Sequence, residues 1–305
     1  MGVTIIGGTG FIGRHLAKEL SARGVPATAI SSRPDYRFLS EHAPTVQGAE
    51  LGTSEASSAL ESATVVIHLA HRSRPASNLE GEANEIAENV EPAARLFSQL
   101  ASLEAGVRII YASSGGQIYG ASHGTPIPES AASEPQTSYA LGKHMIEQLL
   151  HYQSSRGKIR PTILRIANPV GQWQLGGRHG LVSAAVTAAR SGAPLSLFGD
   201  GANMRDYFDA DEFASLLADL ATDPNCPDGT FNIGSGIGLT ERDVFDAVET
   251  ELNVSLQIDQ KPARGFDLPY AVLDIALARR ELGWNPKVPL AQTIGKLDAA
   301  LASAD

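Results

Sequence analysis

A glycine-rich loop near the N-terminus constrains the fold of this chain more than any other feature of the sequence. The short apolar run Val3–Ile6 leads directly into Gly-Gly-Thr-Gly-Phe-Ile-Gly at residues 7–13, and an amphipathic helical pattern follows over 12–23. Glycines at every third position permit a tight turn and close backbone approach, and a helix N-terminus offers unpaired N–H groups to a phosphate. A strand, this loop and a helix in that order predict a dinucleotide-binding turn.

Alternating apolar runs and helical patterns predict an α/β fold. Further strand-like runs lie at residues 27–30, 65–69, 108–112 and 162–166, and helical patterns lie at 83–103 and 139–155. The runs are continuously apolar, which indicates strands covered on both faces. We therefore predict a Rossmann-type doubly wound parallel sheet accompanied by a smaller, mixed substrate-binding domain.

The later part of the chain is less regular and richer in Gly and Pro. Its helical patterns lie at residues 181–191, 211–221, 241–251 and 274–282. We expect an NAD(P)-binding domain over residues 1–170 and the substrate-binding domain over 171–305, and the chain is free to cross back to the first domain.

The end of the second strand indicates which dinucleotide is bound. An NAD site usually carries Asp or Glu there, which accepts a hydrogen bond from the ribose 2′-hydroxyl. This chain has Ser31-Ser32-Arg33 instead, and the nearest acid, Asp35, lies beyond Pro34. Two hydroxyls and a guanidinium suit a 2′-phosphate, since arginine can pair with phosphate through two hydrogen bonds. We therefore favour NADP(H) over NAD(H).

Tyr139 and Lys143 form a candidate catalytic pair. Their spacing of four residues places both side chains on one face of a predicted helix. A neighbouring ammonium stabilises a phenolate, so we expect Lys143 to lower the pKa of Tyr139 and make it a general acid or base near neutral pH.

Composition excludes several function classes. The chain has 24 Lys and Arg against 34 Asp and Glu, a net charge of −10, which disfavours nucleic acid or a membrane surface as partner. The single Cys226 excludes an intramolecular disulfide. No carboxylate or cysteine lies at ligand spacing from His68 or His71, so we expect no metal site and no chemical role for His68. We expect a cytoplasmic protein.

Several motifs together resemble the extended short-chain dehydrogenase/reductase family, and in particular its nucleotide-sugar epimerases, dehydratases and ketoreductases. They are the glycine loop, Tyr139-x-x-x-Lys143 and the segment Ser-Ser-Gly-Gly-Gln-Ile-Tyr-Gly at 113–120. The likeness continues through Arg-x-x-Asn at 165–168, Phe-Gly-Asp-Gly at 198–201, Arg-Asp-Tyr at 205–207 and Leu-Gly-Trp at 282–284, and so covers nearly the whole chain in order.

The resemblance implies roles for individual residues. Tyr139 would exchange a proton with a sugar hydroxyl or ketone, and Lys143 would hold the nicotinamide ribose. Gly115 stands at the family's usual hydroxyl position, so Ser114 is our choice of replacement, with Ser113 and the Gln117 amide as alternatives. The predicted cofactor-binding residues are Gly7, Gly10, Phe11, Ile12, Gly13, Ser31, Ser32, Arg33, Glu50, Leu51, Leu69, Ala70, Tyr139 and Lys143. The predicted substrate-binding residues are Asn168, Arg178, Arg205 and Arg264, with the arginines facing a diphosphate.

Three functions remain open, and the first two concern a nucleoside-diphosphate sugar. The first choice is a UDP-sugar 4-epimerase. The alternative, favoured by Ser31-Ser32-Arg33, is an NADPH-dependent ketoreductase of a 4-keto-6-deoxy nucleotide sugar. A non-catalytic nucleotide-sensing protein is the third hypothesis, because a fold does not guarantee chemistry. A dehydratase is disfavoured, since Gly116 and Gln117 stand where that group carries Asp-Glu. We also expect a homodimer formed through the helices at 83–103 and 139–155.

Overall fold

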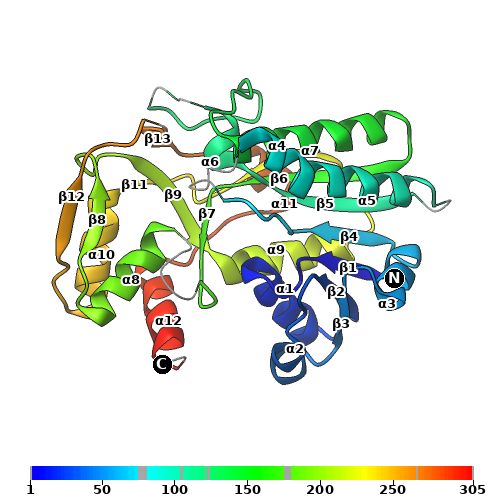
Figure 1. Cartoon of the computed structure of the whole chain (residues 1–305), viewed down its shortest axis with the longest axis horizontal. Coiled ribbons are helices and arrows are strands. Elements are labelled where there is room, and N and C mark those ends of the chain that lie inside the picture. Colours follow the sequence, from blue (N-terminus) through cyan, green and yellow to red (C-terminus); the bar gives the residue numbers. More distant parts are fainter. Residues whose placement is uncertain are drawn as a thin grey trace. The chain divides into compact units, whose positions relative to one another are not determined.

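The computed structural model describes residues 2–74, 81–103, 106–120, 122, 124–174, 180–265 and 267–303. Two compact units divide the chain, and each is assembled from three stretches. Unit 1 comprises Met1–Ile118, Pro135–Arg165 and Ala214–Phe231, and unit 2 comprises Tyr119–Glu134, Ile166–Phe213 and Asn232–Asp305. Figure 1 labels their helices and strands.

A seven-stranded sheet with the order β10-β6-β5-β4-β1-β2-β3 forms the centre of unit 1. Its strands are β1 (Val3–Ile6), β2 (Ala27–Ser31), β3 (Val46–Glu50), β4 (Val65–His68), β5 (Val107–Ser114), β6 (Ile159–Ile166) and β10 (Gly229–Ile233). The pairs β1–β2, β1–β4, β2–β3 and β4–β5 are all parallel. The doubly wound fold class is confirmed.

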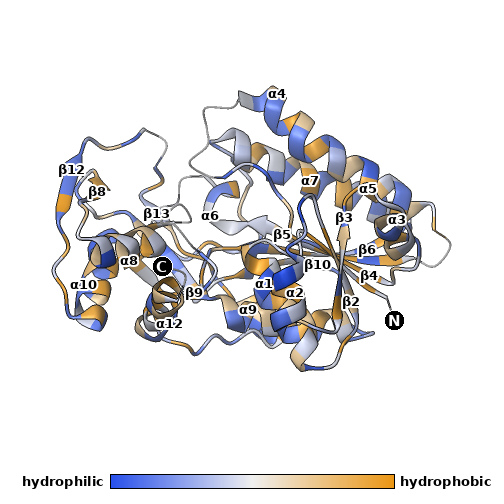
Figure 2. Ribbon diagram, turned by 60° about the horizontal axis from the view of Figure 1, so that its bottom comes forward, coloured by the Kyte–Doolittle hydropathy of each residue, from blue (hydrophilic) through white to orange (hydrophobic). Residues whose placement is uncertain are grey.

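Helices cover both faces of this sheet. They are α1 (Phe11–Ala22), α2 (Tyr36–His42), α3 (Ser54–Glu61), α4 (Gly81–Glu85), α5 (Glu91–Ala101), α6 (Gly115–Ile118) and α7 (Ser138–Ser155), with α9 (Ala210–Thr222) completing the set. In Figure 1, α5 and α7 lie together on one side of the sheet and α1 lies on the other. Figure 2 shows strands that are mostly hydrophobic and helices that mix both kinds of residue, as this layering requires.

The predicted helix over 83–103 is interrupted. A π-helical turn, Ile86–Val90, separates α4 from α5, and Pro92 lies in the first turn of α5. Proline has no N–H to donate to the carbonyl four residues earlier, so the α-helical hydrogen-bond ladder cannot run unbroken through this point.

Unit 2 contains smaller sheets and its own core. Strands β7 (Asn168–Val170), β11 (Gly238–Thr240) and β13 (Tyr270–Ala271) all pair with β9 (Met204–Asp209), while β8 (Leu195–Phe198) pairs with β12 (Ile258–Lys261). Helices α8 (Leu181–Ser191), α10 (Glu241–Leu252) and α12 (Leu290–Ala302) pack around a buried apolar cluster, and α11 (Ala276–Leu282) precedes α12. Within the described residues, no helix combines the length and apolarity needed to cross a membrane.

Candidate active site

The glycine loop is a tight turn that requires glycine at Gly7 and Gly13. Gly7 has φ +86° and its N–H donates to Ile30 O at 2.7 Å. A Cβ on Gly7 would approach Ala70 N to 2.9 Å, and one on Gly13 would approach Gly8 C to 2.6 Å. Gly10 caps α1 without a side-chain hydrogen bond. The first turn of α1 therefore points backbone N–H groups, with no competing side chain at the cap, toward any anion bound there.

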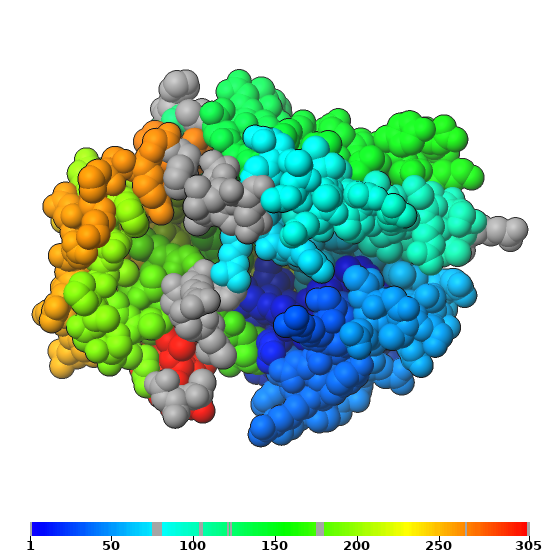
Figure 3. All heavy atoms as spheres, in the orientation of Figure 1, coloured from blue at the N-terminus to red at the C-terminus, as the bar shows by residue number. Residues whose placement is uncertain are grey.

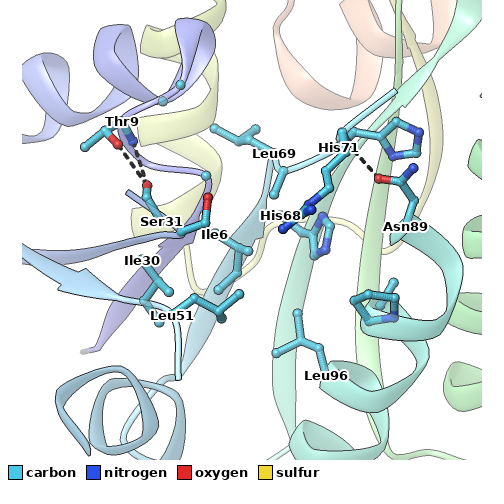
Figure 4. A pocket seen from close by; sticks show the side chains of 18 of the residues that line it. Ile6, Thr9, Ile30, Ser31, Leu51, His68, Leu69, His71, Asn89 and Leu96 are labelled. Carbon is cyan, nitrogen blue, oxygen red and sulfur yellow. Dashed lines mark hydrogen bonds between the residues drawn. The ribbon is translucent and has the colours of Figure 1, made fainter. Parts of the chain in front are cut away.

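A pocket of about 760 Å³ opens beside this loop. The space-filling view shows a hollow between the dark blue N-terminal segment and the cyan segment that follows β4 (Figure 3). Eleven of the fourteen predicted cofactor residues line the pocket, namely Gly7, Gly10, Phe11, Ile12, Gly13, Ser31, Ser32, Arg33, Leu51, Leu69 and Ala70. Three apolar residues of its wall, Ile6, Ile30 and Leu96, were not predicted (Figure 4). Leu60 also lines the pocket and was not predicted.

The end of the pocket next to β2 is rich in hydroxyl groups. Thr9 donates to Ser31 Oγ from both its N–H, at 3.2 Å, and its hydroxyl, at 3.0 Å (Figure 4). Asp35 does not line the pocket, because its carboxylate accepts from Phe38 N at 3.0 Å and pairs with Arg14 at 2.6 Å. These interactions hold the pKa of Asp35 below its ordinary value. Glu50 is exposed at the end of β3 and is also outside the lining.

Tyr139 and Lys143 lie in the first turns of α7, next to the end of β5. Thr137 caps this helix by accepting from Ala140 N at 3.1 Å. Lys143 is buried, and its Nζ donates to Ala112 O at 2.8 Å and lies 5.9 Å from the centre of the Tyr139 ring. Ser114, the last residue of β5, is hydrogen-bonded to Tyr139.

Three of the four predicted substrate-binding residues lie in unit 2. Asn168 donates to Asp206 O at 2.8 Å, and Arg205 is on the neighbouring strand β9. Arg264 pairs with Asp267 at 2.8 Å and stacks over the Phe198 ring at 4.2 Å. Arg205 and Arg264 are close enough for their positive charges to repel each other. Arg178 lies outside the described residues.

Comparison with known proteins decides the family. Residues 3–234 match the model of the NAD dependent epimerase/dehydratase family. The chain belongs to this family. The predicted resemblance and the prediction of an NAD(P)-dependent enzyme of this kind are both confirmed.

Individual members of the family match over their whole length. The dTDP-4-dehydro-6-deoxyglucose reductase of Escherichia coli is 32% identical over 97% of this chain and 96% of its own. The UDP-glucose 4-epimerase of Thermotoga maritima, solved with UDP-glucose, is 27% identical with a TM-score of 0.86 and covers 100% of this chain and 99% of its own. The UDP-glucose 4-epimerase of Thermus thermophilus, solved with NAD, is 25% identical with a TM-score of 0.86 and covers 100% of both chains.

The pocket suits the dinucleotide of the NAD-dependent epimerase/dehydratase family. The test is steric: Cβ atoms on Gly7 or Gly13 would lie 2.3–2.9 Å from backbone atoms, so glycine at these positions lets the loop turn tightly into the first turn of α1, as a dinucleotide-binding loop requires. The glycine loop would hold the pyrophosphate, Ser31, Ser32 and Arg33 would face the adenosine ribose, and Leu69 and Ala70 would lie along the dinucleotide.

Burial controls the ionisation of the family's Tyr–Lys pair in this chain. It raises the pKa of Tyr139 to about 12, against the lowering effect of the Ser114 hydrogen bond. It lowers the pKa of Lys143 to about 7, opposed by the charges of Glu85 and Glu147. The prediction that Lys143 lowers the pKa of Tyr139 is therefore wrong. Burial penalises the phenolate, and Lys143 Nζ donates to the Ala112 carbonyl. Tyr139 carries its proton at neutral pH and can donate it.

Two residues near Tyr139, His71 and Glu85, were not predicted as site residues from the sequence. The His71 ring meets the Tyr139 ring edge to face, with centroids 5.1 Å apart, and His71 Nε2 lies 2.9 Å from Glu85 Oε1. No carboxylate stands at ligand spacing from His71 in the sequence, but folding brings Glu85 to it from 14 residues away. No local signal marks Glu85, which stands among other acids in a short polar helix.

Proposed function

We propose that this chain is an NADPH-dependent reductase of a 4-keto-6-deoxy nucleoside-diphosphate sugar. The observation that carries the proposal is the end of the pocket at β2, where Ser31, Ser32 and Arg33 line the wall and Asp35 is already engaged. A guanidinium and two hydroxyls suit a 2′-phosphate, whereas a 2′-hydroxyl usually meets a free carboxylate. A reductase consumes its reductant in every turnover, and that reductant is typically NADPH. The 32% identity to the Escherichia coli reductase supports the same choice.

When bound, NADPH would supply the hydride that reduces the carbonyl carbon, and the residues of this chain would orient the ketone and supply the proton. Tyr139, which is protonated at neutral pH, donates its phenolic proton to the carbonyl oxygen. Ser114 orients the Tyr139 hydroxyl through their hydrogen bond and takes the place of the hydroxyl missing at Gly115. Ser113 is less suited, since its buried Oγ makes no hydrogen bond within the described part of the chain.

Charged residues would hold the remaining parts of the reactants. Lys143 would bind the nicotinamide ribose and favour return of the proton to Tyr139. Asn168, Arg178, Arg205 and Arg264 would bind the diphosphate or the adjoining sugar, and paired arginines can bind phosphate strongly where water is excluded. The local positive charge of these arginines would reconcile an anionic substrate with the chain's net charge of −10.

A UDP-hexose 4-epimerase is the second candidate. It is favoured by the similarity over the full length to the Thermotoga maritima epimerase solved with UDP-glucose. The same Tyr139 and Lys143 would serve it, but Tyr139 would have to begin as a base, and its raised pKa opposes this.

One assay separates these functions. The purified chain is freed of nucleotide and incubated with dTDP-4-keto-6-deoxyglucose and NADPH, or with UDP-glucose and no added cofactor. Stoichiometric loss of NADPH absorbance with formation of a 4-hydroxy sugar supports the reductase. Formation of a C4-inverted hexose from UDP-glucose, with no NADPH consumption on the keto sugar, would instead establish the epimerase. Nucleotide binding without turnover of either sugar would favour the sensor.

The predicted assembly and location belong to the same proposal. We expect a cytoplasmic homodimer in which α5 and α7 pack against the same helices of a second copy. Sedimentation of the purified chain at micromolar concentration as a monomer would contradict the dimer.

A further inference from the structure

The carboxylate of Glu85 is buried against the helix that carries Tyr139 and Lys143. Glu85 is 3% exposed, Ser73 Oγ donates to its Oε2, and His71 Nε2 lies 2.9 Å from its Oε1. A Cβ on Gly142 would approach Glu85 Cγ to 2.6 Å. The carboxylate therefore lies directly on the α7 backbone, at the position next to Lys143.

The groups that hold Glu85 do not neutralise it. Burial pushes the pKa of Glu85 upward, but the close approach of His71 and the hydrogen bond from Ser73 more than offset this and keep it below its ordinary value. Burial lowers the pKa of His71 to about 4, so His71 is neutral at pH 7. Among the described residues, no lysine or arginine lies within ion-pair distance of Glu85. An ionised carboxylate held by neutral donors needs a nearby cation if its burial is to be tolerated.

Lys143 is the cation that can balance the buried charge of Glu85. Its Nζ donates to the Ala112 carbonyl, which carries no charge. Glu147, the other carboxylate whose charge acts on Lys143, is already paired with Arg165, with Nη2–Oε2 at 2.7 Å. Glu85 meets α7 at the residue next to Lys143, so the two are buried groups of opposite charge, and neither has another ionic partner among the residues that the structure describes.

The remaining ionisable groups around the pair are neutral. Burial lowers the pKa of His68 in β4 to about 3 and raises that of Tyr111 in β5 well above its ordinary value. His71 and Tyr139 are likewise uncharged at pH 7. These four side chains therefore contribute no compensating charge, and the carboxylates whose charges act on Lys143 are Glu85 and the Arg165-paired Glu147.

We propose that Glu85 is a positioning residue of the Tyr139–Lys143 pair: its negative charge keeps Lys143 as an ammonium and Tyr139 protonated, and its contact with His71 fixes the ring that packs on Tyr139. The role in catalysis rests on the proposed reductase function. The pair would then enter ketone reduction with both protons in place, whereas oxidation of a sugar hydroxyl would be opposed.

Titration of Lys143 tests the charge directly and requires no turnover. The full chain is produced with ¹³C- and ¹⁵N-labelled lysine. The NMR signal of the Lys143 side chain is assigned by its absence from the Lys143→Met variant. The pH at which this signal is halfway through its titration, the Lys143 midpoint, is then measured. Glu85→Gln removes a negative neighbour, so the midpoint should fall by on the order of one pH unit. Glu85→Asp, which keeps the charge, should restore most of the shift. Glu82→Gln, an identical change at an exposed position of α4, should leave the midpoint unchanged.

A second arm covers a Glu85 variant that does not fold. Gly142→Ala places a methyl group where the carboxylate lies and should displace it, lowering the Lys143 midpoint in the same direction. In ketone reduction, Glu85→Gln should lower kcat and move the alkaline limb of the pH profile to lower pH, with KM for NADPH unchanged.

The outcomes separate the two proposals. An unchanged Lys143 midpoint in Glu85→Gln and Gly142→Ala overturns the role of Glu85, even if the variants are less active, because a structural loss would reduce the rate equally at every pH. A shifted midpoint in a protein that reduces no keto sugar supports the charge pairing and removes the reductase function instead.

Discussion

The candidate site has two ends that are built in opposite ways: the pocket beside the glycine loop, and the Tyr139–Lys143 pair, which lies outside the lining of that pocket. At the glycine loop, backbone forms the site, and side chains matter chiefly because they are absent at Gly7 and Gly13. At the catalytic end, buried ionisable side chains from β4, β5, α4 and α7 set one another's charge. The first end is therefore controlled by sterics and the second by electrostatics. Substitutions at the two ends should fail in different ways, which the following predictions test.

Tyr139→Phe should have the largest effect. Removing the phenolic proton should lower turnover by about 10²–10⁴-fold, the usual contribution of a general acid, while NADPH binding remains close to that of the unchanged chain. Steady-state rates and a fluorescence titration with NADPH would measure both. Tyr152→Phe, on the exposed side of the same helix, is the matched control. Turnover retained in Tyr139→Phe would exclude this residue as the proton donor.

Gly13→Ala should damage the backbone-built end and spare the ionisable groups. Its Cβ would lie 2.6 Å from Gly8 C, which cannot move without opening the turn. We expect about 100-fold weaker NADPH binding, or ~2.7 kcal/mol, and ~1–3 kcal/mol lower stability from overpacking. Calorimetric titration and urea unfolding would measure these losses. Gly116→Ala, where a Cβ meets open space, should cause neither; equal losses in both variants would contradict the steric account.

Arg33→Ala tests the preference between the two dinucleotides. Loss of a charged hydrogen-bonding partner of a 2′-phosphate costs ~1.5–3 kcal/mol, so NADPH affinity should fall by about 10–100-fold. NADH affinity should hardly change, because that ligand has no 2′-phosphate. Arg37→Ala, an exposed arginine paired with Glu41, provides the control. A similar loss for both dinucleotides would refute the role of Arg33 in selection.

Gly142→Ala, at the catalytic end, should have the smallest effect of the four changes. The sign of its effect on the free energy of unfolding shows whether Glu85 occupies the space beside Gly142. Alanine in place of glycine within a helix normally stabilises by about 0.5–1 kcal/mol. Here the new Cβ would collide with Glu85, so we expect a net loss of ~1–2 kcal/mol. Urea unfolding of Gly142→Ala and of the double variant Glu85→Ala/Gly142→Ala would measure this loss of stability. The double variant should regain part of the stability lost by Glu85→Ala alone.

Local sequence patterns predicted the backbone-built end well. The glycine loop, its flanking strand and helix, and Ser31–Arg33 all lie within one continuous stretch, so their spacing carries the geometry. Strand β3 was not among the predicted runs, because Val-Gln-Gly-Ala-Glu has few apolar residues and lies at the edge of the sheet. Its Gly48 packs against Tyr36 and Leu39 of α2, a contact that the spacing does not reveal.

The electrostatics of the catalytic end could not be predicted in the same way. Tyr139-x-x-x-Lys143 gave the two residues, but the sign of the Tyr139 pKa shift depends on burial and on where the Lys143 ammonium donates. Glu85 and His71 reach the pair only after the sheet and α7 assemble, and neither stands at a recognisable spacing. Separations between side chains that meet only in the tertiary structure are not encoded in a single local pattern.

The π-helical turn at Ile86–Val90 makes the catalytic end sensitive to chain length. It inserts about one extra residue into a helix in which each residue turns ~100° about the axis. Glu85, directly before the turn, meets His71 and Ser73, and Asn89, within the turn, accepts from Arg72 N at 2.7 Å. Deleting one residue from this turn would rotate Glu85 away from Gly142 while α5 kept its place in the core. Insertions and deletions here could thus retune proton chemistry across relatives without altering their fold, a route of divergence that substitutions alone do not offer.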